Sequence, residues 1–336
     1  PIKSSAASDV YKRQKQDKAR VMADNKTLDF NIIASDCLIA TDIDSAEVIG
    51  RLEALKQKYS EMELIAIFNY FLKIEYRPDV LCWLIRAVDK YRDSSSLPIL
   101  TELLLMKDHT PSADYTKDYY TNVRVMCAKA ISNLKDHNSV HAFLYCLNDK
   151  NENYKVRLSC ADALGKLGDK YAVTTLMDVV SDESEKSVYI RESAAVALGL
   201  IGDIRAVDSL VNILETKNGI MDKFTYLKEK VVEAICKLNP NDDRVFKALK
   251  NSLGDENPQV RINTIEALME YETDEAKALI KKMLKDEDDE VKVNAVIALY
   301  NIEGEGILNE IINDSQYSQV CKEEAQNILN NEQDYE

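Results

Sequence analysis

Glycine and proline are scarce in this chain, which has 9 and 6 of them among 336 residues. Leucine, alanine, lysine and glutamate are plentiful instead, and this composition favours an all-helical protein. Long apolar runs are also missing, because none approaches the length needed to cross a membrane. The sequence therefore predicts a soluble helical chain for which a membrane is not an expected partner.

Paired cysteines are missing as well. The seven cysteines form no C-x-x-C motif, and several fall where a helix would bury a small apolar side chain. This pattern is typical of free thiols in a reducing compartment, and it predicts a cytoplasmic location.

Motifs for catalysis and metal binding are not found in the sequence. No serine or cysteine stands in a recognisable nucleophile context, and there is no glycine-rich phosphate loop. The only histidines are His109, His137 and His141, and no carboxylate or cysteine joins them at metal-ligand spacing. We therefore expect no catalytic residue, no metal site and no cofactor. The single tryptophan, Trp83, lies in the middle of a predicted helix, and packing in the hydrophobic core explains it.

Basic residues are outnumbered by acidic ones, which gives a formal net charge of −15 at pH 7. Such a surface repels phosphate groups, so nucleic acid is not an expected partner. The simpler interpretation of the charge is that it keeps an elongated protein in solution.

The first residues are set apart from the rest. Residues 9–14, DVYKRQ, resemble the translation of a transposase adapter used to build sequencing libraries. We expect residues 1–14 to be an artefactual, disordered tag on a metagenomic fragment of bacterial origin. The natural sequence would then begin near Lys15, and its own N-terminal part would already be missing.

A repeat becomes visible when the chain is aligned on the arginine of YKVRLSCADALGKLGD, residues 154–169. Its equivalents, all but the first of them basic, are Leu81, Arg124, Arg157, Arg191, Lys228, Arg261, Lys292 and Lys322. Six residues later an alanine recurs, at positions 87, 130, 163, 197, 234, 267 and 298, and an aliphatic residue follows it. A match kept over this many units predicts an array of similar structural elements.

Each repeat predicts two helices. A second helix is expected at residues 172–180, 206–214, 245–253 and 276–284, where apolar residues recur every three or four positions. Neither helix buries its apolar stripe alone, so neighbouring pairs must stack, and the small residues of the first helix allow a close approach. Gly168 and Gly202 are expected as left-handed helix ends, with Asp169 and Asp203 as the next N-caps.

The recurring basic residue is expected to pair with aspartates that end the preceding helices. This structural ladder, with arginine stems over apolar surface, is favoured over a row of cations for an anionic ligand. Its predicted members are Asp149, Arg157, Asp182, Arg191, Asp255, Arg261, Asp286 and Lys292.

The strings VRLSCADALGKLGD and IRESAAVALGLIGD resemble HEAT-like repeats of the phycobilisome-lyase type. The resemblance implies a right-handed α-solenoid, in which the helices that carry the arginines line a concave face. We assign the repeat array to residues 78–330, truncated N-terminal helices and a worn repeat to residues 15–77, and a frayed tail to residues 331–336. Deoxyhypusine-type di-iron hydroxylases share such repeats, but they need His-Glu pairs that this sequence lacks.

Two sets of residues are candidates for binding a partner. Aliphatic residues expected on the concave face are Val125, Leu158, Val196, Leu200, Ile262 and Val293. Aromatic residues expected at one edge, on long inter-helix links or just before an arginine, are Tyr115, Tyr119, Tyr120, Tyr154, Tyr189, Phe224 and Tyr226. The alternatives are ordinary packing against the next helix pair for the first set, and capping of helix ends for the second.

The function predicted from these observations is a non-enzymatic scaffold that binds another protein or peptide by its concave face and its edge. The resemblance implies an alternative, a bilin lyase-type subunit that handles a linear tetrapyrrole. A third hypothesis, a nucleic-acid enzyme, requires a basic groove that the acidic composition does not favour.

Overall fold

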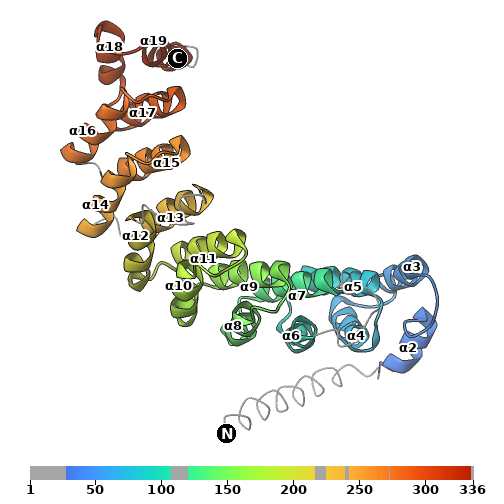
Figure 1. The fold of residues 1–336 in the computed structure, drawn as a ribbon. Coiled ribbons are helices and arrows are strands. Elements are labelled where there is room, and N and C mark those ends of the chain that lie inside the picture. Colours follow the sequence, from blue (N-terminus) through green and yellow to red (C-terminus); the bar gives the residue numbers. More distant parts are fainter. Residues whose placement is uncertain (1–27, 107–119, 216–224, 239–241, 272, 334–336) are drawn as a thin grey trace. The chain divides into compact units, whose positions relative to one another are not determined.

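A computed structural model describes residues 28–106, 120–215, 225–238, 242–271 and 273–333 of the chain. These residues form α-helices joined by short turns and 3-10 helices, with no strand among them. The chain divides into two compact units, Pro1–Leu167 and Gly168–Glu336, and Figure 1 labels the helices of both. None of the helices in the described ranges is both long and apolar enough to cross a membrane.

The first unit contains the helices that precede the clear repeats and the first of the repeats themselves. Its helices are α2 (Phe30–Cys37), α3 (Ser45–Leu55), α4 (Glu61–Ile74), α5 (Pro78–Tyr91), α6 (Leu97–Leu105), α7 (Thr121–Leu134), α8 (Val140–Asn148) and α9 (Tyr154–Leu167). The pair α3 and α4 lies where the sequence predicts a worn repeat. Contacts run from α5 to α7 and from α7 to α9, while α6 packs on α7 and α8 packs on α9.

The second unit continues the alternation of longer and shorter helices. Its helices are α10 (Val173–Ser181), α11 (Val188–Ile201), α12 (Val207–Glu215), α13 (Thr225–Leu238), α14 (Asp243–Ser252), α15 (Pro258–Met269), α16 (Asp274–Met283), α17 (Asp289–Glu303), α18 (Glu305–Asn313) and α19 (Gln319–Gln333). Helix α19 includes residues 331–333, which corrects their assignment to a frayed tail. The four second helices predicted in the sequence correspond to α10, α12, α14 and α16.

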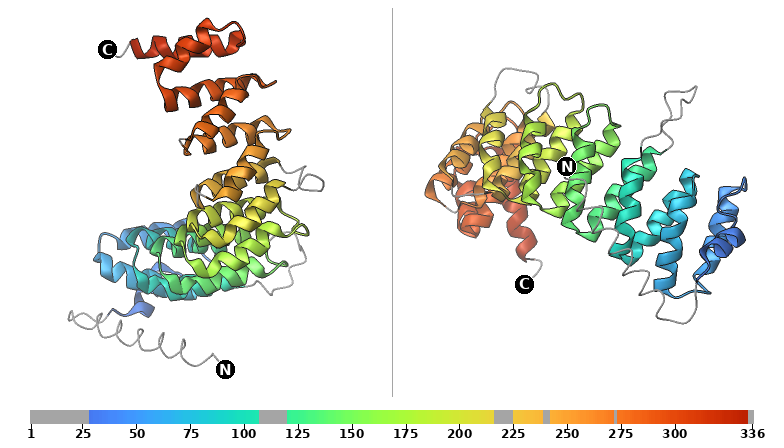
Figure 2. Two further views of the ribbon diagram at one scale, coloured as in Figure 1. Left: turned by 90° about the vertical axis from the view of Figure 1, so that its left-hand side faces the viewer. Right: turned by 90° about the horizontal axis from the view of Figure 1, so that it is seen from below.

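Two layers are visible within each unit, and we name their helices accordingly. A helices carry the recurring basic position, and in the second unit α11, α13, α15 and α17 contact one another in sequence order. B helices connect them, and each of α10, α12, α14 and α16 packs against the A helix that follows it. Figures 1 and 2 show this separation of the layers from three directions. The described chain is thus an all-α solenoid of stacked helix pairs.

The turn between an A helix and its B helix has the same construction in several repeats. The A helix ends at a residue with positive φ, at Arg92, Lys135, Gly168 and Gly202. An aspartate follows, and its carboxylate accepts a hydrogen bond from a backbone N–H two residues later; Asp169 and Asp203 do so over 2.8 and 3.0 Å. The predicted helix end and N-cap are confirmed at both glycines.

Small residues allow two A helices to approach closely. A Cβ atom added to Gly199 of α11 would lie 2.8 Å from the Cα atom of Ala234 and 3.0 Å from its Cβ atom in α13. Carbon atoms prefer separations of about 3.5–4.0 Å, so this position has no room for a larger side chain. The small residues of α11 therefore allow close packing between repeats, as the sequence predicts.

Candidate protein-binding face

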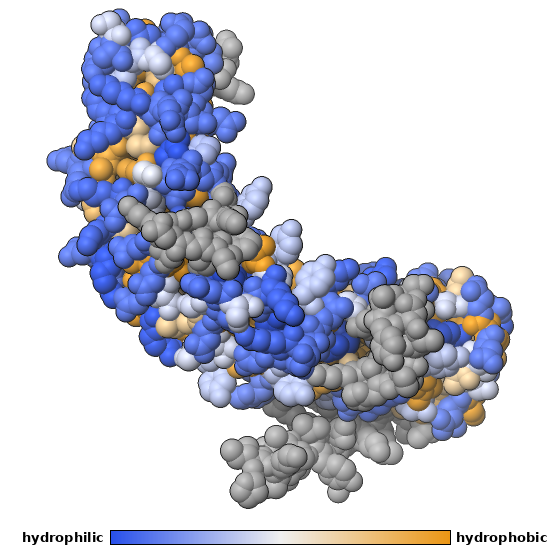
Figure 3. Space-filling view, viewed as in Figure 1, coloured by the Kyte–Doolittle hydropathy of each residue, from blue (hydrophilic) through white to orange (hydrophobic). Residues whose placement is uncertain are grey.

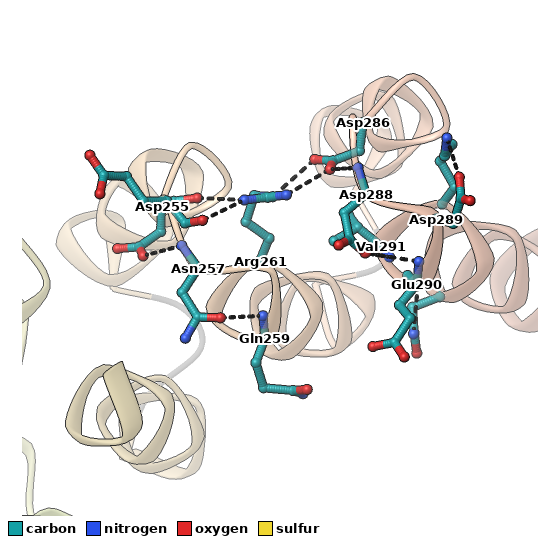
Figure 4. A network of polar contacts seen from close by, with 12 residues as sticks. Asp255, Asn257, Gln259, Arg261, Asp286, Asp288, Asp289, Glu290 and Val291 are labelled. Carbon is teal, nitrogen blue, oxygen red and sulfur yellow. Dashed lines mark hydrogen bonds and ion pairs between the residues drawn. The ribbon is translucent and has the colours of Figure 1, made fainter. Parts of the chain in front are cut away.

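Arg261 forms one rung of the predicted ladder in the second unit. Its Nη1 donates to the backbone oxygens of Asp255 and Glu256 over 2.7 and 3.3 Å, while Nε and Nη2 donate to the two carboxylate oxygens of Asp286 over 3.0 and 2.7 Å. Figure 4 shows the guanidinium between the turn before α15 and the turn before α17. Arg261 therefore links two successive repeats through a bidentate, buried ion pair.

Other basic residues of the repeat bind the end of a B helix or the following turn. Arg157 Nε donates to the Leu147 oxygen over 2.9 Å, and Arg191 Nε donates to the Val180 oxygen over 3.0 Å. These oxygens lie in the last turns of α8 and α10, where carbonyl groups lack helical partners. Lys228 Nζ lies 2.9 Å from a carboxylate oxygen of Asp255. This ion pair is the rung of the ladder that precedes the rung of Arg261.

Further predicted members of the ladder make contacts within their own helix or turn. Lys292 pairs with Asp289 of its own helix over 2.6 Å. Asp149 and Asp182 each accept a backbone hydrogen bond within their own turns, from the N–H groups of Asn151 and Ser184.

In the first unit, Arg124 forms a bidentate pair with Glu152, a residue that was not predicted. Its Nε also donates to the Leu104 oxygen over 2.9 Å. Glu152 was missed because it follows the aligned aspartate, Asp149, by three residues in the same turn.

Burial changes the pKa of Arg191, whose guanidinium binds the end of α10. Removal from water lowers the pKa of its guanidinium, while the carboxylates of Glu183, Asp182 and Glu185 oppose that effect. A basic side chain held in this way is committed to its own chain. Arg191 therefore links the end of α10 to α11 within the stack.

Four predicted binding residues of the second unit lie on the solvent side of α11 and α13. Tyr189 and Leu200 of α11 are 61% and 50% exposed, and Tyr226 of α13 is 69% exposed. Val196, between the two α11 residues, is half-buried. These side chains, together with Glu192 of α11 and Glu229 and Glu233 of α13, are hereafter called the A-helix face.

Ile262 corrects the sequence prediction. It is only 5% exposed, and the equivalent Glu229 of α13 is 8% exposed, so both side chains pack largely within their own chain. Val293 of α17 is half-buried, as are Val125 and Leu158 of the first unit.

The aromatic residues predicted at the edge divide into different groups. Tyr154 is 49% exposed at the start of α9. Tyr120 instead contacts its own chain, because its hydroxyl donates to the Tyr76 backbone oxygen over 2.6 Å. Tyr115, Tyr119 and Phe224 lie outside the described residues.

Glutamates of the A-helix face were missed by the sequence prediction. Glu192 and Glu229 occupy the position that follows the basic residue, where four other repeats carry Val125, Leu158, Ile262 and Val293 and the last repeat carries Glu323. Burial, and a neighbouring carboxylate in each case, raise the pKa of both groups, while Lys230 acts in the opposite direction. Lys230 itself pairs with Glu233 over 2.7 Å. The signal available in the sequence was the replacement of an aliphatic residue by glutamate in two successive repeats of this register.

The A-helix face combines aromatic rings, aliphatic side chains and carboxylates on neighbouring helices. Aromatic anchors beside aliphatic side chains are typical of surfaces that bind proteins. In the described part of the chain, no three histidine, cysteine, aspartate or glutamate side chains are grouped so as to hold a metal ion.

Comparisons with known proteins address the fold. A family model for HEAT repeats matches residues 110–188, 142–221 and 218–300. A search of curated proteins finds no match. Among solved structures, human deoxyhypusine hydroxylase in complex with glycerol is 17% identical, with a TM-score of 0.33, and the match covers 82% of this chain and 96% of that one.

Two further structures are similar at the same level. The complex of CpcE and CpcF of phycocyanin lyase from Nostoc sp. PCC7120 is 17% identical with a TM-score of 0.39, covering 87% of this chain and 95% of that one. A mutant of Kap121p is 12% identical with a TM-score of 0.47, covering 88% of this chain and 40% of that one.

Proposed function

Because the chain belongs to the HEAT repeat family, we propose that it is a scaffold that binds another protein through the A-helix face. The observation that carries this proposal is the exposure of Tyr189, Leu200 and Tyr226 on two neighbouring A helices. Stacked repeats of this kind present extended surfaces built from equivalent positions.

Two features of the fold support a binding role. The A helices are held by buried ion pairs and close helix contacts, so their exposed side chains sit on a rigid support. A preorganised surface loses less conformational entropy on association than a flexible one. The edge tyrosines Tyr189 and Tyr226 lie two residues before the aligned basic position of their repeats, so they continue the face towards the turns.

The domain assignment and location belong to the same proposal. The binding array extends over residues 78–330, preceded by helices of residues 28–77 that continue the stack. All seven cysteines are free, and six of them are buried. Thiols of this kind persist in a reducing environment, which supports a cytoplasmic location.

The test is affinity capture with matched variants of the full chain. Tyr226→Ala removes an exposed ring from the A-helix face, whereas Tyr171→Ala removes a ring of similar exposure, 66%, from the turn before α10. We expect a set of proteins that the wild-type chain and Tyr171→Ala retain and that Tyr226→Ala loses. Circular dichroism spectra of the three proteins should coincide, because both side chains are largely outside the core.

Two results would contradict the proposal. If the captured proteins are the same for all three chains, the A-helix face is not the binding surface. If Tyr171→Ala alone loses them, binding uses the opposite end of the helix pairs.

A further inference from the structure

We infer that the A-helix face takes a segment rich in lysine and arginine, with apolar side chains between its cations, from the partner protein. This inference rests on the proposed function, because it names the chemistry of the partner for the same face. It follows from the charges on α11, α13 and α15 and from the side chains that lie between them.

Negative charge on this face is only partly compensated. Lys230 lies among Glu192, Glu229 and Glu233, but its ammonium group is 2.7 Å from Glu233. Glu229 is 8% exposed, and the hydrogen bond that it accepts from Asn257 Nδ2 is 3.4 Å, near the upper limit for such a bond. A cation from a partner would therefore meet the half-buried Glu192 and Glu233, beside a buried Glu229 that the chain itself neutralises incompletely.

The raised pKa values also relate these carboxylates to the stability of the fold. Partial burial and mutual repulsion disfavour the ionised forms of Glu192 and Glu229 in the folded protein. Ionised glutamates at these positions thus lower the stability of the fold at neutral pH. Functional residues are often kept at a cost in stability, and four other repeats carry aliphatic side chains at this position.

Acidic residues continue along the neighbouring helix. Glu266 is exposed on α15 and Glu270 directly after it. Glu270 lies close enough to Cys236 of α13 to raise the pKa of that thiol, and the exposed Lys237 acts on it in the opposite direction. The carboxylates therefore extend across α11, α13 and α15, which suits an elongated cationic segment better than a single ion.

Uncharged groups define the rest of the partner. Tyr189 and Tyr226 occupy equivalent positions on adjacent A helices, and the faces of exposed tyrosine rings attract guanidinium and ammonium groups. Val196 and Leu200 provide a short aliphatic strip beside them. In the view of Figure 3 the hydrophobic areas are small and separated by hydrophilic surface.

The experiment uses the full chain and a labelled synthetic peptide of leucine and lysine with amphipathic helical spacing, followed by fluorescence anisotropy. A second peptide carries glutamate in place of every lysine. We expect the cationic peptide to bind, the acidic peptide not to bind, and added salt to weaken binding because exposed charges are screened.

Matched variants locate the binding. Glu192→Gln combined with Glu229→Gln should raise the Kd for the cationic peptide by about tenfold or more. Glu287→Gln combined with Glu305→Gln changes the net charge equally at exposed positions away from the A-helix face, and should leave the Kd unchanged. The melting temperature of the first double variant should equal or exceed that of the wild type, which excludes unfolding as the cause of weaker binding.

The outcomes distinguish this inference from the proposed function. If the acidic peptide binds as well as the cationic one, or if the two double variants have the same Kd, the inference is overturned. If Tyr226→Ala still loses captured proteins in that case, the face binds a partner of different chemistry and the proposed function stands. If Tyr226→Ala loses none, the proposed function fails by its own test.

Discussion

Replacement of Gly199 by alanine tests whether small residues set the spacing of the A helices. Alanine is favoured over glycine by about 1 kcal/mol in a helix interior, so propensity alone predicts stabilisation. The added methyl group would lie 2.8 Å from the Cα atom of Ala234 and 3.3 Å from its backbone oxygen. Backbone atoms of a packed helix do not rotate away, and overpacking of this kind costs about 1–3 kcal/mol.

The two terms together predict that Gly199→Ala lowers the free energy of unfolding by up to about 2 kcal/mol. Gly50 lies inside α3 with no atom within 4 Å of an added Cβ atom, so Gly50→Ala should instead raise stability by up to about 1 kcal/mol. Gly306 of α18, in the same unit as Gly199, is equally open and serves as a second control.

Urea denaturation followed by circular dichroism measures these changes. In thermal unfolding, a change of 1 kcal/mol corresponds to about 2–4 °C for a unit of this size. Equal stabilisation by Gly199→Ala and Gly50→Ala would refute the argument, because the α11–α13 contact would then tolerate a methyl group without cost.

Three further predictions concern the ladder, a helix cap and a thiol. Arg261→Met should lower the free energy of unfolding by about 3–5 kcal/mol in urea denaturation, because Asp286 would remain buried without its partner. A loss below about 1 kcal/mol would show that this ion pair is dispensable for stability. The pKa of Asp203 is lowered to about 2, mainly by its hydrogen bonds with Arg205. Its contribution to stability is therefore present above the unfolded value near 3.8 and lost as pH falls towards 2, and Asp203→Asn should flatten the acid limb of a stability–pH curve. Burial raises the pKa of Cys236 to about 12, so this thiol should react slowly with a thiol reagent at pH 8 and rapidly in denaturant. Fast labelling of Cys236 in the native protein would contradict the stacking of the helices.

The sequence was most informative where residues serve packing. The string around Arg191 repeats that around Arg157 because each small or apolar residue meets an equivalent neighbour, so one alignment predicts helices, turns and caps together. Gly202 and Asp203 could be assigned in advance, since a left-handed helix end and an N-cap have narrow residue preferences.

Prediction failed where the outcome depends on a neighbouring repeat. Ile262 has the register of an outward residue, but its exposure depends on the bulk of adjacent side chains, and the structure buries it. Glu152 binds Arg124 because the turn before α9 is arranged differently from the turn before α17, where Asp286 binds Arg261. The face carboxylates were overlooked for a related reason. They depart from the aliphatic residues that four other repeats carry, and an alignment on the repeat does not predict such departures.

The measurement that tests the account most directly is the affinity of one captured partner for Leu200→Asp and Ile204→Asp. Both residues are exposed to a similar extent, 50% and 52%, but Leu200 belongs to the A-helix face and Ile204 to the turn that follows α11. The account predicts that Leu200→Asp raises the Kd by about tenfold or more while Ile204→Asp leaves it unchanged, with equal melting temperatures. Equal affinity of the two variants would contradict it.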